Sequence, residues 1–342
     1  MAETAAIALM SEKISSSIFT MFGWKIQGPI NQNWKCENGG HAKQTHPTDV
    51  CFWYDDPYSS SAVYINTDLK SYAASSIKKG AIVDAINSLA IATECANSSL
   101  PWKGLHTHED KNADIIGMLF VYNHDGEYDK DFAKMMGEIE AKDLQIPRGV
   151  KIQVAGPADI AYLATVANDI KCSRGESHED QDVYLPPADK CQFFYPNLVR
   201  KRVKSTKRHH ATLELALAPW QILHHSRIES IPEKPSEVRD AYTIYYRGQG
   251  STIDEFKYLF DYLFRFQLVG DYQYISIRMP FPCKEAYAHF SAAIDSYFEH
   301  YFRGFHAIGQ IQQQKNRITM RSITNVVTRF SEVEIGMESR HA

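Results

Sequence analysis

Residues 45–72 read THPTDVCFWYDDPYSSSAVYINTDLKSY, and this stretch decides the fold of the first part of the chain. Val50–Tyr54 is a short apolar run of mainly aromatic residues, which is typical of a β-strand. Asp55–Ser61 contains Pro57 and three serines, as expected of a turn. Ala62–Tyr72 is a second strand, so the stretch predicts an antiparallel β-hairpin.

The second strand of this hairpin places an acidic and a basic side chain close together. Side chains alternate between the faces of a strand, so Asp68 and Lys70 share one face. Asp49 stands at the head of the first strand, and antiparallel pairing brings its carboxylate toward that of Asp68. Two neighbouring carboxylates repel each other unless a cation lies between them, and Mg²⁺ prefers such hard oxygen ligands. We expect Asp49 and Asp68 to bind Mg²⁺, for which Mn²⁺ can substitute, and Lys70 to stabilise charge on a phosphate.

The sequence PTD at residues 47–49, followed by DLK at residues 68–70, resembles the PD-(D/E)xK nuclease superfamily, whose fold many restriction endonucleases share. The resemblance covers about residues 5–170 and implies that Asp49 and Asp68 are metal ligands and Lys70 the catalytic lysine. More narrowly, the chain is similar to nuclease-like subunits of bacterial anti-phage defence systems. Many members of the superfamily carry Glu where this chain has Asp68.

Members of this superfamily often carry a Glu on the first helix, facing the site. An apolar stripe predicts such a helix over residues 5–22. Glu12 is the nearest candidate but lies on the side of the helix opposite to the stripe, whereas Glu3 has the better phase. Neither is included among the predicted site residues.

Periodicity predicts the elements that surround the hairpin. They are the helix at 5–22, a helix at 79–96, strands at 115–122 and 150–155, and a helix at 157–170. This order predicts an α/β fold, a three-layer α/β/α restriction-endonuclease-like core with a mixed sheet. We assign residues 1–172 to this nuclease-like domain, and the polar, acidic residues 173–195 to a surface loop and connection.

Residues 196–342 predict a second domain. Strands at 241–246 and 272–279 alternate with amphipathic helices at 252–266 and 283–302. This pattern indicates a C-terminal α/β domain built as a βαβα unit. We expect it to contact nucleic acid or to serve in oligomerisation.

The net charge of −4 conceals an asymmetry along the chain. Residues 1–195 carry 17 basic and 26 acidic residues, whereas the remainder has a net charge of +5. Six cations fall within nine residues of the second part, namely Arg200, Lys201, Arg202, Lys204, Lys207 and Arg208. This run predicts a phosphate-binding stripe, although a solvated surface loop explains it equally well. Lys315, Arg317, Arg321 and Arg329 extend the stripe.

Composition excludes several classes of protein. The chain has 342 residues, 44% of them hydrophobic, which is enough for two domains with their own cores. The N-terminus lacks the basic segment of a signal peptide, and no apolar run reaches the roughly 18–20 residues that cross a bilayer. Six dispersed cysteines indicate reduced thiols. We therefore expect a cytoplasmic protein without a membrane partner. The phosphate-binding loop of nucleotide hydrolases does not occur, which argues against ATP hydrolysis.

Cys36, His41, His46 and Cys51 fall at steps of five and are residue types that bind zinc. Zinc fingers usually place their ligands in closely spaced pairs, about two to four residues apart. Cys51 also lies inside an apolar strand, where a free cysteine packs as an ordinary core residue. The spacing therefore argues against zinc, and a zinc-containing interaction protein stays a secondary hypothesis.

These features together predict a metal-dependent endonuclease that hydrolyses phosphodiester bonds of DNA in anti-phage defence. Its expected partners are DNA and either another protein subunit or a second copy of the chain. The alternative is a catalytically silent nuclease-fold subunit that binds DNA or acts as a scaffold in a multi-protein defence complex.

Overall fold

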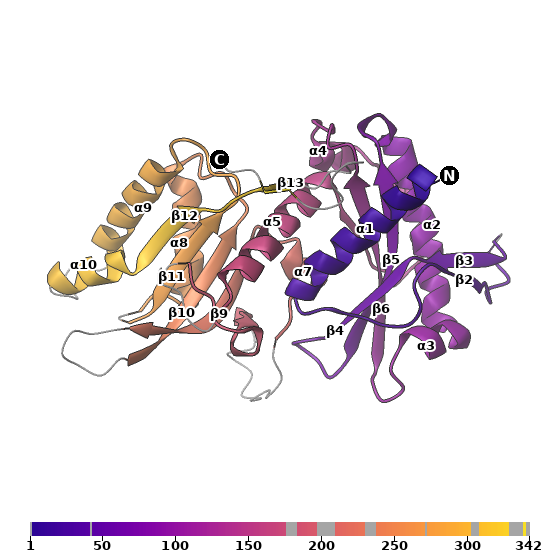
Figure 1. Cartoon of the computed structure of the whole chain (residues 1–342), viewed down its shortest axis with the longest axis horizontal. Helices are drawn as coiled ribbons and strands as arrows, with labels where there is room; N and C mark the ends of the chain where they lie inside the picture. Colours follow the sequence, from indigo (N-terminus) through magenta and orange to yellow (C-terminus); the bar gives the residue numbers. More distant parts are fainter. Residues whose placement is uncertain are drawn as a thin grey trace. The chain divides into compact units, whose positions relative to one another are not determined.

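The computed structural model describes residues 2–41, 43–175, 183–196, 209–229, 237–270, 272–301, 308–327 and 338–339. The chain folds into two compact units. The first comprises residues 1–167, 210–217 and 326–340, and the second comprises residues 168–209, 218–325 and 341–342. Each unit contains a five-stranded sheet with helices packed on it (Figure 1).

The first unit is built on a sheet with the strand order β1-β4-β5-β6-β7. Its strands are β1 (Lys25–Ile26), β4 (Val50–Asp55), β5 (Ala62–Tyr72), β6 (Ala113–Asn123) and β7 (Ile152–Ala155). β4 and β5 pair antiparallel as the predicted hairpin, whereas β5 pairs parallel with β6, and β6 with β7. The mixed sheet expected from the sequence is therefore confirmed.

Helices cover both faces of this sheet (Figure 1). The helices are α1 (Ala2–Met21), α2 (Lys79–Ser98), α3 (Leu100–His106), α4 (Phe132–Gly137), α5 (Pro157–Ser173, which continues into the second unit) and α7 (Leu213–Ala216), with short 3-10 turns η1 (Ala74–Ser76) and η2 (Ala141–Asp143). On one face, Phe19 of α1 packs edge-on against Phe52 of β4, with ring centroids 5.1 Å apart. On the other face, the next residue of β4, Trp53, shares a buried cluster with Cys95 of α2 and Trp102 of α3. Consecutive strand residues point to opposite faces, so the sheet is the middle layer of an α/β/α sandwich.

The sequence of α2 explains why it lies on the sheet. Ile82, Ile86 and Leu89 recur three and four residues apart, which places them on one side of a helix. They share a buried cluster with Leu119 and Val121 of β6. This apolar side anchors α2, and its C-terminal end is thereby positioned beside the segment that precedes β4.

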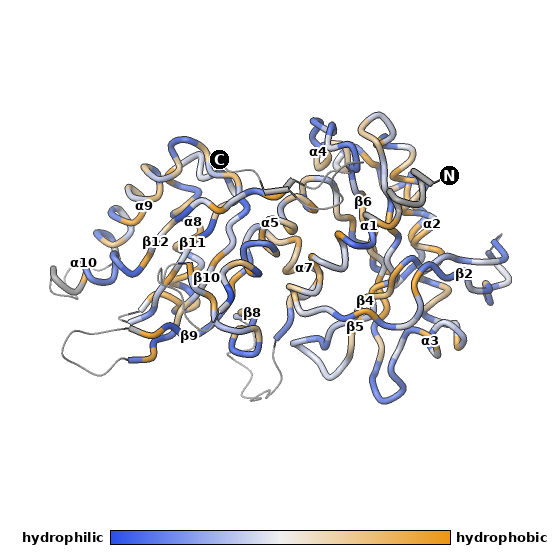
Figure 2. The backbone as a smooth tube through the Cα atoms, in the orientation of Figure 1, coloured by the Kyte–Doolittle hydropathy of each residue, from blue (hydrophilic) through white to orange (hydrophobic). Residues whose placement is uncertain are grey.

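That segment forms a two-stranded ribbon which the sequence does not predict. β2 (Gln32–Lys35) pairs antiparallel with β3 (Thr45–Thr48), so that Trp34 lies opposite His46. Only Trp34 of β2 and the alternate residues His46 and Thr48 of β3 are buried. Figure 2 contrasts the hydrophilic β2 with the hydrophobic β4. A polar segment without a clear period thus becomes ordered through three buried side chains.

The second unit contains a sheet with the strand order β12-β11-β10-β9-β8. Its elements are β8 (Gln192–Phe193), β9 (Trp220–Glu229), β10 (Glu237–Tyr246), β11 (Tyr274–Met279), β12 (Ile318–Ser322), η3 (Ala188–Lys190), α8 (Ile253–Arg265), α9 (Ala286–Tyr301) and α10 (Ile308–Asn316). β10, β11 and β12 are parallel, whereas β9 pairs antiparallel with β8 and β10. Phe256 and Phe260 of α8 pack with Ile244 and Ile277 of the sheet and with Phe290 of α9. The additional α/β character of the C-terminal part is confirmed, and β9 and β12 extend it beyond the predicted βαβα unit.

Within residues 173–195, which the sequence assigns to a surface loop, Leu185, Cys191 and Phe193 are buried and β8 belongs to a sheet. β13 (Val326–Val327) and β14 (Glu338–Ser339) form a separate antiparallel pair. In the described part of the chain, no helix combines the length and the apolar character needed to cross a membrane.

Candidate active site

Asp49 lies at a bend between β3 and β4, where the chain passes from the ribbon into the main sheet. Its backbone N–H donates to the carbonyl oxygen of Thr67 over 3.3 Å. Its carboxylate oxygen Oδ2 accepts a hydrogen bond from the backbone N–H of Leu69 at 2.7 Å. Both partners belong to β5, so the backbone and the side chain of Asp49 are tied to the same strand.

The residue before Asp49 is held by a set of buried hydrogen bonds that we call the indole clamp, formed by Thr48, Trp34, Trp102 and Asn66. The Thr48 hydroxyl accepts from the indole N–H groups of Trp34 and Trp102, each at 3.0 Å, and donates to Oδ1 of Asn66 at 2.9 Å. All four side chains are buried. A hydroxyl offers one donor and two acceptor positions, so every hydrogen-bonding position of Thr48 is used. The clamp fixes the backbone from which Asp49 projects.

Asp68 and Lys70 lie on the same face of β5. The Nζ atom of Lys70 is 2.7 Å from Oδ1 of Asp68, and the two side chains are 33% and 12% exposed, respectively. β5 is paired on both sides, with β4 and with β6, so its backbone is constrained along both edges. Leu69 points to the opposite face, yet its backbone N–H holds Asp49. The structure therefore brings the three residues expected from the sequence into one group.

The electrostatics of this group follow from two carboxylates near one ammonium. Burial raises the pKa of Asp49 to about 6, and the adjacent Asp68 adds to the rise, while the Leu69 N–H and Lys70 oppose it. Asp49 and Asp68 are close enough for a side-chain hydrogen bond between them. Burial on its own lowers the pKa of Lys70, but Asp68 and Asp49 outweigh it, so its pKa lies above the ordinary lysine value. Lys70 is thus protonated, and its single positive charge cannot balance the negative charges of two ionised carboxylates.

This donor set fits a divalent cation. Two carboxylates supply hard oxygen ligands, and their partial burial leaves little solvent to screen the repulsion between them. A cation would remove that repulsion, which otherwise contributes to the raised pKa of Asp49. Residues Asp49 and Asp68 can hold such an ion, and Lys70 lies beside them.

Glu12 of α1 is linked to Asp49 through one residue. Its Oε2 atom accepts a hydrogen bond from the side-chain amide of Asn31 at 3.3 Å, and the backbone N–H of Asn31 donates to the carbonyl oxygen of Asp49 at 2.7 Å. Asn31 adopts a left-handed backbone conformation with φ of 53°. The helical periodicity of α1 places Glu12 on the side opposite to the apolar stripe. Glu12 can therefore contact the polar loop that contains Asn31. The link could not be found from the sequence because Asn31 lies in a segment without a period.

The predicted phosphate-binding stripe at residues 200–208 lies outside the described residues, as does Arg329. In the proposed extension, Lys315 forms an ion pair with Asp295 at 2.8 Å. The guanidinium group of Arg317 lies 5.5 Å from the ring centroid of Tyr274. The stripe therefore stays a prediction from the sequence.

The architecture of the first unit and the Asp-x-Lys sequence on its central strand are consistent with a PD-(D/E)XK core. Residues 1–159 match the family model described as the GAPS4 protein PD-(D/E)XK nuclease domain, which represents an anti-phage defence family. Residues 1–159 are thus similar to the PD-(D/E)XK nuclease domain of this family, and the resemblance expected from the sequence is confirmed over these residues. Nucleases of this superfamily typically use divalent metals. No curated protein and no solved structure matches the chain.

Proposed function

We propose that the chain is a Mg²⁺-dependent endonuclease that hydrolyses phosphodiester bonds of DNA during defence against phage. The observation that carries this proposal is the adjacent pair Asp49 and Asp68, with Lys70 held 2.7 Å from Asp68. The family match supports nuclease chemistry and a defence role. The cation run at residues 200–208 supports a nucleic-acid substrate. All six cysteines are free thiols, which suits a protein of the reducing cytoplasm.

Asp49 and Asp68 would hold the divalent cation, Mg²⁺ or Mn²⁺, through their carboxylate oxygens. When bound, such an ion supplies Lewis-acid stabilisation of the charge on the phosphate and lowers the pKa of a water molecule.

The residues of the chain supply positioning and charge. Lys70 has three N–H donors, and Asp68 orients the ammonium group through one of them. The other donors can contact a non-bridging phosphate oxygen and the attacking water. The backbone N–H of Leu69 holds the Asp49 carboxylate in place. Together these contacts align water for in-line attack and stabilise the negative charge of the transition state.

The test is an assay of the full-length protein on supercoiled plasmid, linear duplex and single-stranded DNA, with Mg²⁺, Mn²⁺ or EDTA. The site variants are Asp68→Asn and Lys70→Gln. The matched controls are Asp114→Asn and Lys151→Gln, because these residues form an exposed Asp–Lys pair at 3.4 Å in the same unit. We expect the controls to cleave like the wild type and the site variants to lose at least about a hundredfold in rate.

Three outcomes would overturn parts of the proposal. Unchanged cleavage by Lys70→Gln would refute the role of that lysine. Cleavage of RNA but not DNA under matched conditions would refute the substrate class. DNA binding without cleavage by the wild type, in every metal tested, would establish instead the catalytically silent subunit.

A further inference from the structure

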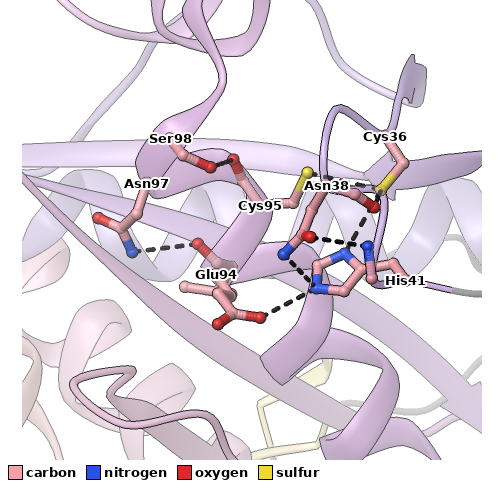
Figure 3. Close-up of polar contacts among 9 residues, drawn as sticks. Cys36, Asn38, His41, Glu94, Cys95, Asn97 and Ser98 are labelled. Carbon is pink, nitrogen blue, oxygen red and sulfur yellow. Dashed lines mark hydrogen bonds and ion pairs between the residues drawn. The ribbon is translucent and has the colours of Figure 1, made fainter.

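A second group of chemistry-bearing side chains lies where the β2–β3 ribbon meets α2. The ligand atoms of Cys36, His41, His46 and Cys95 all lie within 4.8 Å of one another. Cys36 follows β2, His41 lies in the turn, His46 belongs to β3, and Cys95 belongs to α2. Figure 3 shows the sulfur atoms of Cys36 and Cys95 near each other, with the ring of His41 directed toward Cys36. We call this group the ribbon cluster.

Two distances within the ribbon cluster match the edges of a tetrahedral zinc centre. The sulfur atoms of Cys36 and Cys95 are 3.7 Å apart, and Nδ1 of His41 lies 3.4 Å from the sulfur of Cys36. With Zn–S bonds of about 2.3 Å and Zn–N bonds of about 2.0–2.1 Å, the edges of a tetrahedron are about 3.8 Å between sulfurs and about 3.5 Å between sulfur and nitrogen. A disulfide would instead need its sulfur atoms about 2.05 Å apart, and both cysteines are free.

His46 supplies independent evidence for a ligand. Its side chain is fully buried, and neither ring nitrogen has a hydrogen-bond partner among the described residues. Buried polar atoms nearly always have a partner, because leaving one unpaired costs free energy. The ring packs against those of Trp34 and His41, with centroids 5.0 and 5.5 Å away. A metal ion within the ribbon cluster would provide the partner that this imidazole lacks.

The surroundings of His41 also suit a metal ligand. While Nδ1 of His41 faces the sulfur of Cys36, its other ring nitrogen, Nε2, lies 2.9 Å from a carboxylate oxygen of Glu94 (Figure 3). A carboxylate that holds the second nitrogen of a histidine is the usual outer partner of a zinc-binding imidazole. Lys43, in the same turn, donates to the hydroxyl of Ser88 on α2 at 2.7 Å. The turn is thus held on α2 at two points, through Glu94 and through Ser88.

We propose that Cys36, His41, His46 and Cys95 bind a structural zinc ion whose four coordination positions are all filled by protein. Thiolate and imidazole ligands favour zinc over magnesium, so this site differs in chemistry from the carboxylate pair. Three of the ligands come from the ribbon and its turn and one comes from α2, so the ion fastens the ribbon to the helix. The inference does not depend on the proposed nuclease activity.

The proposed zinc site differs in one ligand from the set that the sequence offers. In the sequence, Cys51 is the fourth candidate, and both the spacing of the four residues and the place of Cys51 in an apolar strand argue against zinc. The Cys51 thiol is instead buried within β4, 3.8 and 3.9 Å from the backbone carbonyl oxygens of Phe52 and His106. Cys95, on α2, takes the fourth position. Because His46 lies three residues before Asp49, the ion holds the strand that leads into the candidate active site.

The test is elemental analysis of the full-length protein, purified in reductant without chelator, together with Co²⁺ titration of the metal-free form. We expect about one zinc per chain and the visible absorption bands of four-coordinate thiolate-bound Co²⁺. Cys95→Ser should lose both signals. Cys51→Ser and the exposed Cys172→Ser are the matched controls, and Asp68→Asn excludes binding at the carboxylate pair; all three should retain both signals.

If Cys95→Ser fails to fold, a variant of Glu94, the carboxylate partner of His41, still tests the proposal. Glu94→Gln keeps a hydrogen-bond acceptor for His41 but removes the charge, and it should weaken zinc binding by about 10- to 100-fold. Substoichiometric zinc together with no thiolate–cobalt bands in the wild type would overturn the proposal. Full zinc content in Cys95→Ser, or a Cys36–Cys95 disulfide found by mass spectrometry, would do the same.

Discussion

The half-buried carboxylate of Asp49 leads to a quantitative prediction about stability. Asp49→Asn keeps the shape of the side chain and an oxygen that can accept the hydrogen bond from Leu69, which is 2.7 Å long in the wild type. It also offers Asp68 an amide donor in place of a second negative charge. We therefore expect this substitution to stabilise the metal-free protein while it abolishes cleavage.

The size of this stabilisation follows from the raised pKa of Asp49. A rise from 3.8 to about 6 corresponds to about 3 kcal/mol at 1.36 kcal/mol per unit, as an upper limit. Because the pKa is higher in the folded protein, the protonated carboxyl favours folding at low pH. That contribution is lost as the pH rises through about 6. The stability gained by Asp49→Asn should therefore grow with pH, to at most about 3 kcal/mol at pH 8, and should be about half as large at pH 5.

Urea unfolding in EDTA, followed by tryptophan fluorescence at pH 5 and pH 8, measures the difference in free energy of unfolding between Asp49→Asn and the wild type. Four of the five tryptophans belong to the first unit and Trp220 belongs to the second. A Trp220→Phe background therefore makes the signal specific for the unit that contains Asp49. Asp129→Asn, at an exposed aspartate of the same unit, is the control for the loss of one charge.

Two results would refute this reasoning about Asp49. The first is an Asp49→Asn variant no more stable than the wild type at pH 8. The second is a stability difference that is the same at pH 5 and pH 8, because a buried charge must produce a pH-dependent one. Added Mg²⁺ should stabilise the wild type by mass action and leave the variant nearly unchanged.

Three further predictions concern the site and the substrate. Lys70→Gln should lower the cleavage rate at least about a hundredfold while Mg²⁺ still raises the melting temperature, as measured by calorimetry, because the carboxylates remain. Thr48→Val should lower the free energy of unfolding by about 2–4 kcal/mol, since it leaves two buried indole N–H groups unpaired; the exposed Thr45→Val is the control, and equal stability of the two variants would argue against the clamp. The double variant Lys201→Gln, Lys204→Gln should reduce the slope of log affinity for DNA against log salt by about 2, and an unchanged slope would show that these lysines do not contact phosphate.

The hairpin and its site could be predicted because their signals are local. Alternating residues in Ala62–Tyr72 place Asp68 and Lys70 on one face whatever the rest of the chain does. A turn of a few residues then brings β4 back alongside β5, and Asp49 with it. No distant contact is needed to infer this group.

The ribbon cluster could not be predicted because its contacts join distant parts of the chain. Cys95 lies 59 residues after Cys36. It belongs to a helix, where the sequence pattern indicates only an ordinary core cysteine. The ribbon itself is polar, and its order comes from Trp34 and Thr48 meeting Trp102 far along the chain. β9 was missed for a related reason, because His224, His225 and their polar neighbours interrupt its apolar pattern although it pairs along its whole length with β10.

The bend at Asp49 determines where related chains can differ in length. His46 and Thr48 point inward from β3, and Asp49 must then reach β5. One inserted residue between His46 and Asp49 would make the side chains on one side of the insertion point to the opposite face of the strand. Either the indole clamp or the ribbon cluster would then be broken. The turn between β4 and β5, around residues 58–60, is exposed and lies outside both. Length variation, and an inserted peptide tag or reporter, should therefore be tolerated in that turn and not in the three residues before Asp49.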